Sequence, residues 1–186
     1  MKRKVLTILT ASIIALGVST APANAHVSIQ LKGSSDLAGT SSRIWMSLGH
    51  GCTYQAIKYG TSIFSVKVPA SAGKPTPEFH QGFKTSVVAS TTADATGTPD
   101  FYTVTWTAKS RNWVIDDGTF YDFGLKVTWS KVAQKINFET TQTCFGPAVP
   151  GQSKKPLFLR WTITDGTTKA ATDDTEFGPA PSITTK

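Results

Sequence analysis

Residues 121–129 read Tyr121-Asp122-Phe123-Gly124-Leu125-Lys126-Val127-Thr128-Trp129, and this stretch points to the fold class. Its large apolar residues recur at every second position, so an extended backbone would place them together on one face. A helix would spread the same residues around its surface. The stretch therefore predicts a strand with one buried face and one more polar face.

The same two-residue period returns in five other stretches, which are rich in valine, threonine and aromatic residues: 43–48, 62–69, 101–109, 135–144 and 157–163. Gly, Pro, Asn and Asp gather between them, as they do in turns. No segment after residue 25 has the 3.6-residue apolar stripe of an amphipathic helix. We therefore expect an all-β protein, an antiparallel immunoglobulin-like β-sandwich of seven to nine strands. Most of its core should come from Ile44, Phe64, Val66, Val104, Trp106, Leu125, Val127 and Phe138.

The first 25 residues have a different composition. Met1-Lys2-Arg3-Lys4 is followed by an apolar run from Val5 to Val18 and then by Ala23-Asn24-Ala25. A basic start, an apolar centre and a small-x-small end are the three parts of a bacterial secretory signal peptide. We expect cleavage after Ala25, which would make His26 the first residue of a mature chain of 161 residues.

The mature chain is expected to form one domain over residues 26–166. A largely flexible tail would follow over residues 167–186, with Phe177 able to dock on the sandwich. Loss of three basic residues with the signal peptide lowers the formal net charge from +7 to +4. This modest excess gives little support for nucleic-acid binding. No later apolar stretch is long enough to span a bilayer, and no cysteine follows the cleavage site to carry a lipid anchor. The sequence thus predicts a protein that is soluble after export, in a periplasm or outside the cell.

Cys52 and Cys144 are the two cysteines of the chain. Export places them in an oxidising compartment, where we expect them to form one disulfide. The alternative is a thiolate site for Cu(I). The long separation of the two residues and the lack of a CxxC or MxxM partner argue against that alternative.

Three histidines remain in the mature chain, and they are the main candidates for chemistry. At a free amino terminus, His26 would offer its α-amine and its own Nδ1, which close a chelate ring on one metal ion. Nitrogen ligands in a tetragonal arrangement favour Cu(II). His50 follows a predicted strand and has a glycine on each side, so it is either a hydrogen-bonded turn residue or a metal ligand. His80 lies in a loop-like segment and is expected to be solvated.

Other kinds of site have little support. A structural zinc site needs about four Cys or His ligands, and too few remain if the cysteines pair. The sequence contains no P-loop, dinucleotide fingerprint, GxSxG or HExxH motif. The carboxylate pairs Asp116-Asp117 and Asp173-Asp174 resemble turn and tail residues, because nothing marks the fixed separation that a glycosidase requires.

Six short motifs, taken in order along the mature chain, resemble the YcnI family of bacterial exported copper-binding proteins. The motifs are Ala25-His26-Val27, Gly49-His50-Gly51-Cys52, Val104-Thr105-Trp106-Thr107-Ala108, residues 117–123, Thr141-Gln142-Thr143-Cys144 and Arg160-Trp161-Thr162. The resemblance covers nearly the whole mature chain. It implies a cupredoxin- or immunoglobulin-like sandwich that binds Cu(II) through a mono-histidine brace. His26 matches the brace histidine, and Trp161 matches the tryptophan beside the copper ion.

The family's glutamate ligand has no counterpart at the matching place, since residues 62–73 contain no acid. Glu78 is the nearest carboxylate, so Glu78 or His50 is expected to complete the coordination. The resemblance implies a role in copper acquisition, trafficking or homeostasis, without catalysis. The expected partners are a copper ion and another exported or membrane copper-handling protein.

Two alternatives stay open. A copper-dependent oxidative enzyme would need a second histidine in its brace, either His50 or His80. A metal-free β-sandwich interaction module would leave His26 without a role. Chelation requires two unprotonated nitrogens, so Cu(II) binding should weaken as the pH falls below about 6.

Overall fold

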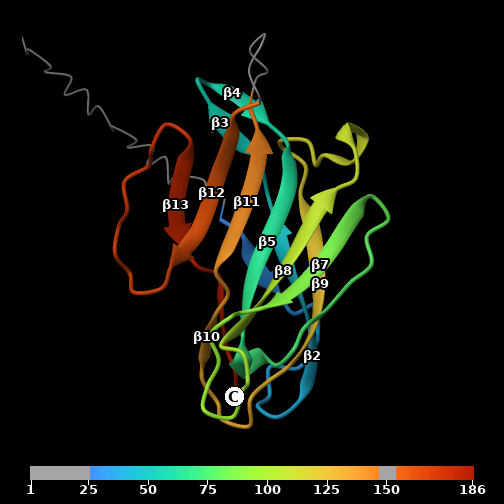
Figure 1. Cartoon of the computed structure of the whole chain (residues 1–186), viewed down its shortest axis with the longest axis vertical. Helices are drawn as coiled ribbons and strands as arrows, with labels where there is room; N and C mark the ends of the chain where they lie inside the picture. Colours follow the sequence, from blue (N-terminus) through green and yellow to red (C-terminus); the bar gives the residue numbers. More distant parts are fainter. Residues whose placement is uncertain (1–25, 147–153) are drawn as a thin grey trace, which may run out of the picture.

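The computed structural model describes residues 26–146 and 154–186, and the predicted signal peptide lies outside these residues. A six-stranded and a four-stranded sheet enclose one hydrophobic core (Figure 1). The predicted all-β sandwich is therefore confirmed.

The four-stranded sheet has the order β1-β2-β9-β6, with every neighbouring pair antiparallel. Its strands are β1 (Ser28–Gln30), β2 (Ser41–Leu48), β9 (Tyr121–Thr128) and β6 (Thr76–Pro77). The six-stranded sheet has the order β13-β12-β11-β5-β8-β7. Its strands are β13 (Thr175–Pro179), β12 (Pro156–Ile163), β11 (Thr140–Phe145), β5 (Thr61–Pro69), β8 (Phe101–Ala108) and β7 (Phe83–Ala89).

Two small ribbons and two short 3-10 helices complete the described part of the chain. The ribbons pair β3 (Cys52–Tyr54) with β4 (Ile57–Tyr59), and β10 (Lys135–Asn137) with β14 (Ser182–Thr184). The helices are η1 (Ala70–Ala72) and η2 (Arg111–Trp113). The described strands therefore outnumber the expected seven to nine, because strands of two or three residues are too short to show a two-residue period.

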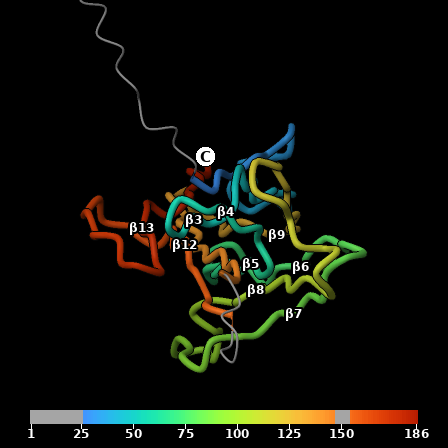
Figure 2. Tube along the Cα trace, turned by 90° about the horizontal axis from the view of Figure 1, so that it is seen from above, coloured from blue at the N-terminus to red at the C-terminus, as the bar shows by residue number. Residues whose placement is uncertain are grey.

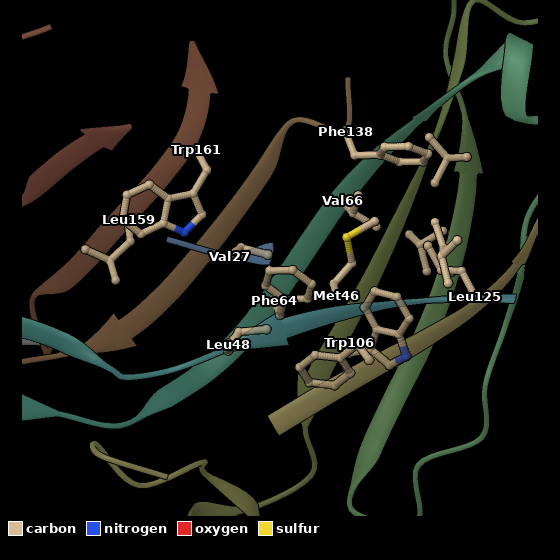
Figure 3. Close-up of a cluster of buried hydrophobic side chains, with 14 of the residues drawn as sticks. Val27, Met46, Leu48, Phe64, Val66, Trp106, Leu125, Phe138, Leu159 and Trp161 are labelled. Atoms are coloured by element: carbon tan, nitrogen blue, oxygen red, sulfur yellow. The ribbon is translucent and has the colours of Figure 1, made fainter. Parts of the chain in front are cut away.

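Alternating burial explains why the long strands form. In β2, Ile44, Met46 and Leu48 are buried, whereas the residues between them are more exposed. Ile44 lies opposite Leu125 of β9, and Met46 lies opposite Phe123. All eight predicted core residues are at most 2% exposed, and several of them appear in the buried cluster of Figure 3. Burial of such side chains stabilises the sandwich by roughly 1.5–3 kcal/mol each.

Residues 135–144 form two strands rather than the single expected one. The first part becomes β10, which pairs with β14, whereas the second part becomes β11 in the six-stranded sheet. Phe138 and Glu139 lie between them, and the main chain changes sheet at this point.

The segment 167–186 differs from the largely flexible tail that the sequence suggested. Its strand β13 pairs in parallel with β12, and β14 pairs with β10. Figures 1 and 2 both show β13 beside β12 at the edge of the six-stranded sheet. Main-chain hydrogen bonds also join Phe138 to Pro181 and Lys186 to Asp36. Backbone pairing needs no apolar side chain, so a polar segment can be ordered without a hydrophobic pattern.

The predicted disulfide is present. It joins Cys52, the first residue of β3, to Cys144 of β11, with a Cα–Cα distance of 6.0 Å. Both cysteines are buried. The bond uses both cysteines of the chain, so the alternative thiolate site for Cu(I) is not formed.

Within residues 26–146 and 154–186, we find no helix with the length and apolar character needed to cross a membrane.

Candidate metal centre

His26 lies two residues before β1 and is half-buried. Its neighbour Val27 is 4% exposed and anchors this segment in the core. The His26 imidazole meets the Trp161 indole edge to face, with ring centroids 4.9 Å apart and planes at 74°. Nδ1 of His26 is buried and has no hydrogen-bond partner among the described residues. This nitrogen is therefore the candidate donor atom of the site.

Trp161 belongs to β12 and is 4% exposed. Its indole extends from β12 toward Val27 (Figure 3). On one side Trp161 pairs with Thr140 of β11, and on the other side it pairs with Gly178 of β13. The Trp161 ring lies directly against Gly178, and Cε1 of His26 is also close to this glycine. The sequence analysis identified His26 and Trp161, which the structure brings together, but it did not identify Gly178.

His50 lies in the turn between β2 and β3 and is held mainly through its main chain. Its carbonyl oxygen accepts a hydrogen bond from Nε2 of the buried Gln142. The next residue, Gly51, donates its N–H to Oδ1 of Asp117 at 2.9 Å. Nδ1 of His50 lies beside the Gly51 carbonyl oxygen, whereas Nε2 is buried without a hydrogen-bond partner in the described part of the chain. These contacts favour the turn role of His50. Sequence analysis missed Gln142, which positions this turn.

Glu78 lies on the outer surface of the four-stranded sheet. Its carboxylate accepts a hydrogen bond of 3.0 Å from Nε1 of Trp45, and its N–H donates to the carbonyl oxygen of Gly124 at 2.8 Å. Trp45 alternates with the buried Ile44 and Met46, so it faces away from the core. Trp161 and the ring of His26 lie on the core side. The structure therefore does not bring Glu78 to His26, because β6 carries the segment before Glu78 to β9.

His80 packs among aromatic side chains, whereas the sequence suggested a solvated loop position. Its Nδ1 and the hydroxyl of Tyr121 share a hydrogen bond of 2.9 Å, and its ring contacts those of Phe83 and Phe123. Burial lowers the pKa of the His80 imidazole, and the nearby Glu78 carboxylate partly opposes that shift. Burial and Glu78 together raise the pKa of Tyr121. Burial among these aromatic rings therefore favours the neutral form of the His80 imidazole.

No group of three or more His, Cys, Asp and Glu side chains could hold one metal ion within the part of the chain that the structure describes. The arrangement that remains is a single imidazole nitrogen beside an indole. A metal ion held here would need its other ligands from the main chain, from solvent or from a second molecule.

Comparison with known proteins adds a family and a fold. Residues 26–183 match the family described as "Domain of unknown function (DUF1775)". The chain is similar to an uncharacterized protein from Nocardia farcinica whose crystal structure reveals an immunoglobulin-like fold. The identity is 19%, the TM-score is 0.57, and the match covers 86% of this chain and 97% of that chain. It supports the predicted immunoglobulin-like fold. No curated protein matches the sequence.

Proposed function

This chain belongs to the DUF1775 family, and from that premise we propose that it is an exported protein that binds Cu(II) through the α-amine and Nδ1 of His26. YcnI-like proteins, which the sequence motifs resemble, carry this domain. The family match begins at His26, which agrees with cleavage after Ala25. The copper ion is cargo in this proposal, and the protein serves copper acquisition, trafficking or homeostasis in the periplasm or outside the cell.

The observation that carries the proposal is the state of the His26 side chain. Its ring is fixed against Trp161, yet no described residue accepts from or donates to its Nδ1. A buried polar atom without a partner costs roughly 1–3 kcal/mol. A metal ion on Nδ1 would remove this cost. The ring orientation is set before the metal arrives, so little conformational entropy is lost on binding.

The proposed ligand set suits Cu(II). The amine and imidazole of one histidine provide two nitrogens in a chelate ring, and nitrogen ligands favour Cu(II) in a tetragonal arrangement. Trp161 would cover one side of the ion. The remaining positions would fall to water or to a ligand from a partner protein, an arrangement that allows copper to be passed on.

The position of His80 favours binding over oxidative catalysis. A two-histidine brace needs a second imidazole at the ion, but His80 is hydrogen-bonded to Tyr121 of β9. In the four-stranded sheet, β9 is separated from β1 by β2.

The test compares two versions of the protein in a Cu(II) titration followed by electron paramagnetic resonance. Both begin at His26, one with a free α-amine and the other with an acetyl group on that amine. The acetyl group turns the α-amine into an amide and removes one ligand, so Cu(II) affinity should fall by at least about 100-fold, the upper end of the losses seen when only an outer-shell partner of a ligand is changed. His26→Gln in the first version is the matched control and should lose the imidazole nitrogen signal. Equal stoichiometry and affinity in both versions would remove His26 from the proposed function.

A further inference from the structure

Three residues lie side by side at one level of the six-stranded sheet. Thr140 of β11, Trp161 of β12 and Gly178 of β13 are consecutive cross-strand neighbours. Thr140 and Trp161 are buried, and so is Gly178. Directly opposed residues of adjacent strands point to the same face, so this row faces the space between the sheets. The last member of the row has no side chain.

The missing side chain leaves room for the tryptophan. A Cβ atom at position 178 would lie 2.5 Å from Cζ3 of Trp161 and still closer to Cε3. It would also lie 3.3 Å from Cε1 of His26. Gly178 is not among the glycines with a positive φ. Glycine is therefore needed here for space and not for an unusual backbone conformation.

We infer that β13 forms one wall of the His26 site and that Gly178 is its positioning residue, acting on His26 through Trp161. A role of this wall in copper binding rests on the proposed function, whereas the packing of Gly178, Trp161 and His26 is present without copper. Because the Cε3–Cζ3 edge of the indole packs against Gly178, β13 limits where the ring can lie. The contact between the Trp161 and His26 rings, with centroids 4.9 Å apart, then makes the position of the His26 imidazole depend on β13.

The pairing of β13 at the edge of the sheet suggests how copper binding and the order of this strand would be coupled. As the outermost strand it has one neighbour, β12. Two hydrogen bonds bracket the pairing: Phe158 N–H donates to the Asp174 carbonyl at 2.7 Å, and Ala180 N–H donates to the Ile163 carbonyl at 2.8 Å. The connecting residues 164–174 are mostly exposed. Edge strands joined by exposed loops open at lower free energy than central strands. If pairing of β13 with β12 raises the affinity of His26 for a metal ion, then the bound ion must stabilise that pairing to the same extent, since such coupling is reciprocal.

The first experiment substitutes Gly178→Ala in the protein that begins at His26. The new methyl group must displace the Trp161 ring, so the imidazole proton resonances of His26 should shift in the copper-free protein. Cu(II) affinity should fall by at least about tenfold, the smaller loss expected when a supporting residue is moved. Glu176→Ala is the matched control on the same strand. Its side chain is exposed, so both readouts should stay at their wild-type values.

A second-site variant separates positioning from general damage to the fold. Trp161→Phe replaces the indole by a smaller ring, which leaves space for a Cβ at position 178. In this background Gly178→Ala should cost less Cu(II) affinity than in the wild type, because neighbours in contact are not additive. If Gly178→Ala alone does not fold, Trp161→Phe/Gly178→Ala should still fold, and failure of this rescue would contradict the packing role of Gly178.

The coupling is measured by trypsin cleavage in the exposed loop, after Lys169. One equivalent of Cu(II) should slow this cleavage several-fold in the wild type. His26→Gln, with the same amount of Cu(II), should be cleaved at the copper-free rate, which controls for any effect of copper on the protease.

Two outcomes would overturn the inference. One is a Gly178→Ala protein that keeps the His26 resonances and the Cu(II) affinity of the wild type. The other is equal loss from Gly178→Ala in the wild-type and Trp161→Phe backgrounds. If the wild type binds no copper, the proposed function fails, while the resonances of copper-free His26 still test the role of Gly178.

Discussion

Opening the Cys52–Cys144 bond should remove a large share of the stability of this protein. The two cysteines are 92 residues apart, so the bond closes a long loop in the unfolded chain. The chain-entropy model assigns a loop of this length about 4–5 kcal/mol at 25 °C. Domains of ordinary stability unfold with about 5–15 kcal/mol. Without the bond, the protein should therefore lie close to its unfolding threshold.

The assay is urea unfolding at equilibrium, followed by tryptophan fluorescence. It compares the wild type with the double variant Cys52→Ala/Cys144→Ala. Both sites are buried, so the alanines also remove packing, and the total loss should be about 4–6 kcal/mol. The wild type in a reductant keeps both sulfur atoms and isolates the cross-link. In both cases the m-value should rise, because an unfolded chain without the link exposes more surface.

A loss below about 2 kcal/mol with an unchanged m-value would refute this reasoning. It would mean that the unfolded chain is already compact without the bond.

Two further substitutions test individual contacts. Gln142→Leu leaves the His50 carbonyl and the buried hydroxyl of Thr61 without their shared donor, so the free energy of unfolding should fall by about 2–4 kcal/mol. An unchanged urea midpoint would show that these acceptors do not depend on the amide. His80→Phe tests pH dependence: burial lowers the pKa of His80 from its ordinary value of 6.5. The buried neutral imidazole of His80 therefore contributes its full stability above about pH 6.5, and this contribution is lost as the pH falls through the folded-state pKa. Melting temperatures at pH 7.5 and pH 5 should differ less in His80→Phe than in the wild type. An identical pH dependence in the two proteins would show that His80 does not contribute to the loss of stability at low pH.

The sandwich could be predicted because its long strands carry their own signal. In β2 buried and more exposed residues alternate, and in β9 every second residue from Phe123 to Val127 is buried. Burial of these faces packs the two sheets together. The strand β13 has no such signal, because backbone pairing with β12 holds it. Gly178 in particular looks like a turn residue in the sequence. Only the position of the Trp161 ring shows why it is glycine.

The candidate site was predictable only in part. His26 follows from the pattern of the first 25 residues, and Trp161 follows from the family resemblance. Glu78 was chosen for its place in the sequence, but the pairing of β6 with β9 carries it to the outer face. His80 was expected in solvent, yet its aromatic neighbour Tyr121 lies 41 residues further along the chain. Contacts of this range leave no local pattern in the amino-acid sequence.

The parallel pairing of β12 with β13 has a consequence for biosynthesis. A ribosome releases a polypeptide amino end first, so His26 emerges long before β13, which carries Gly178. Until then, a nascent chain presents its imidazole without the packing that orients it. Under the proposed function, His26 would therefore take up copper only after β13 has been made, so a shorter nascent chain would stay unloaded.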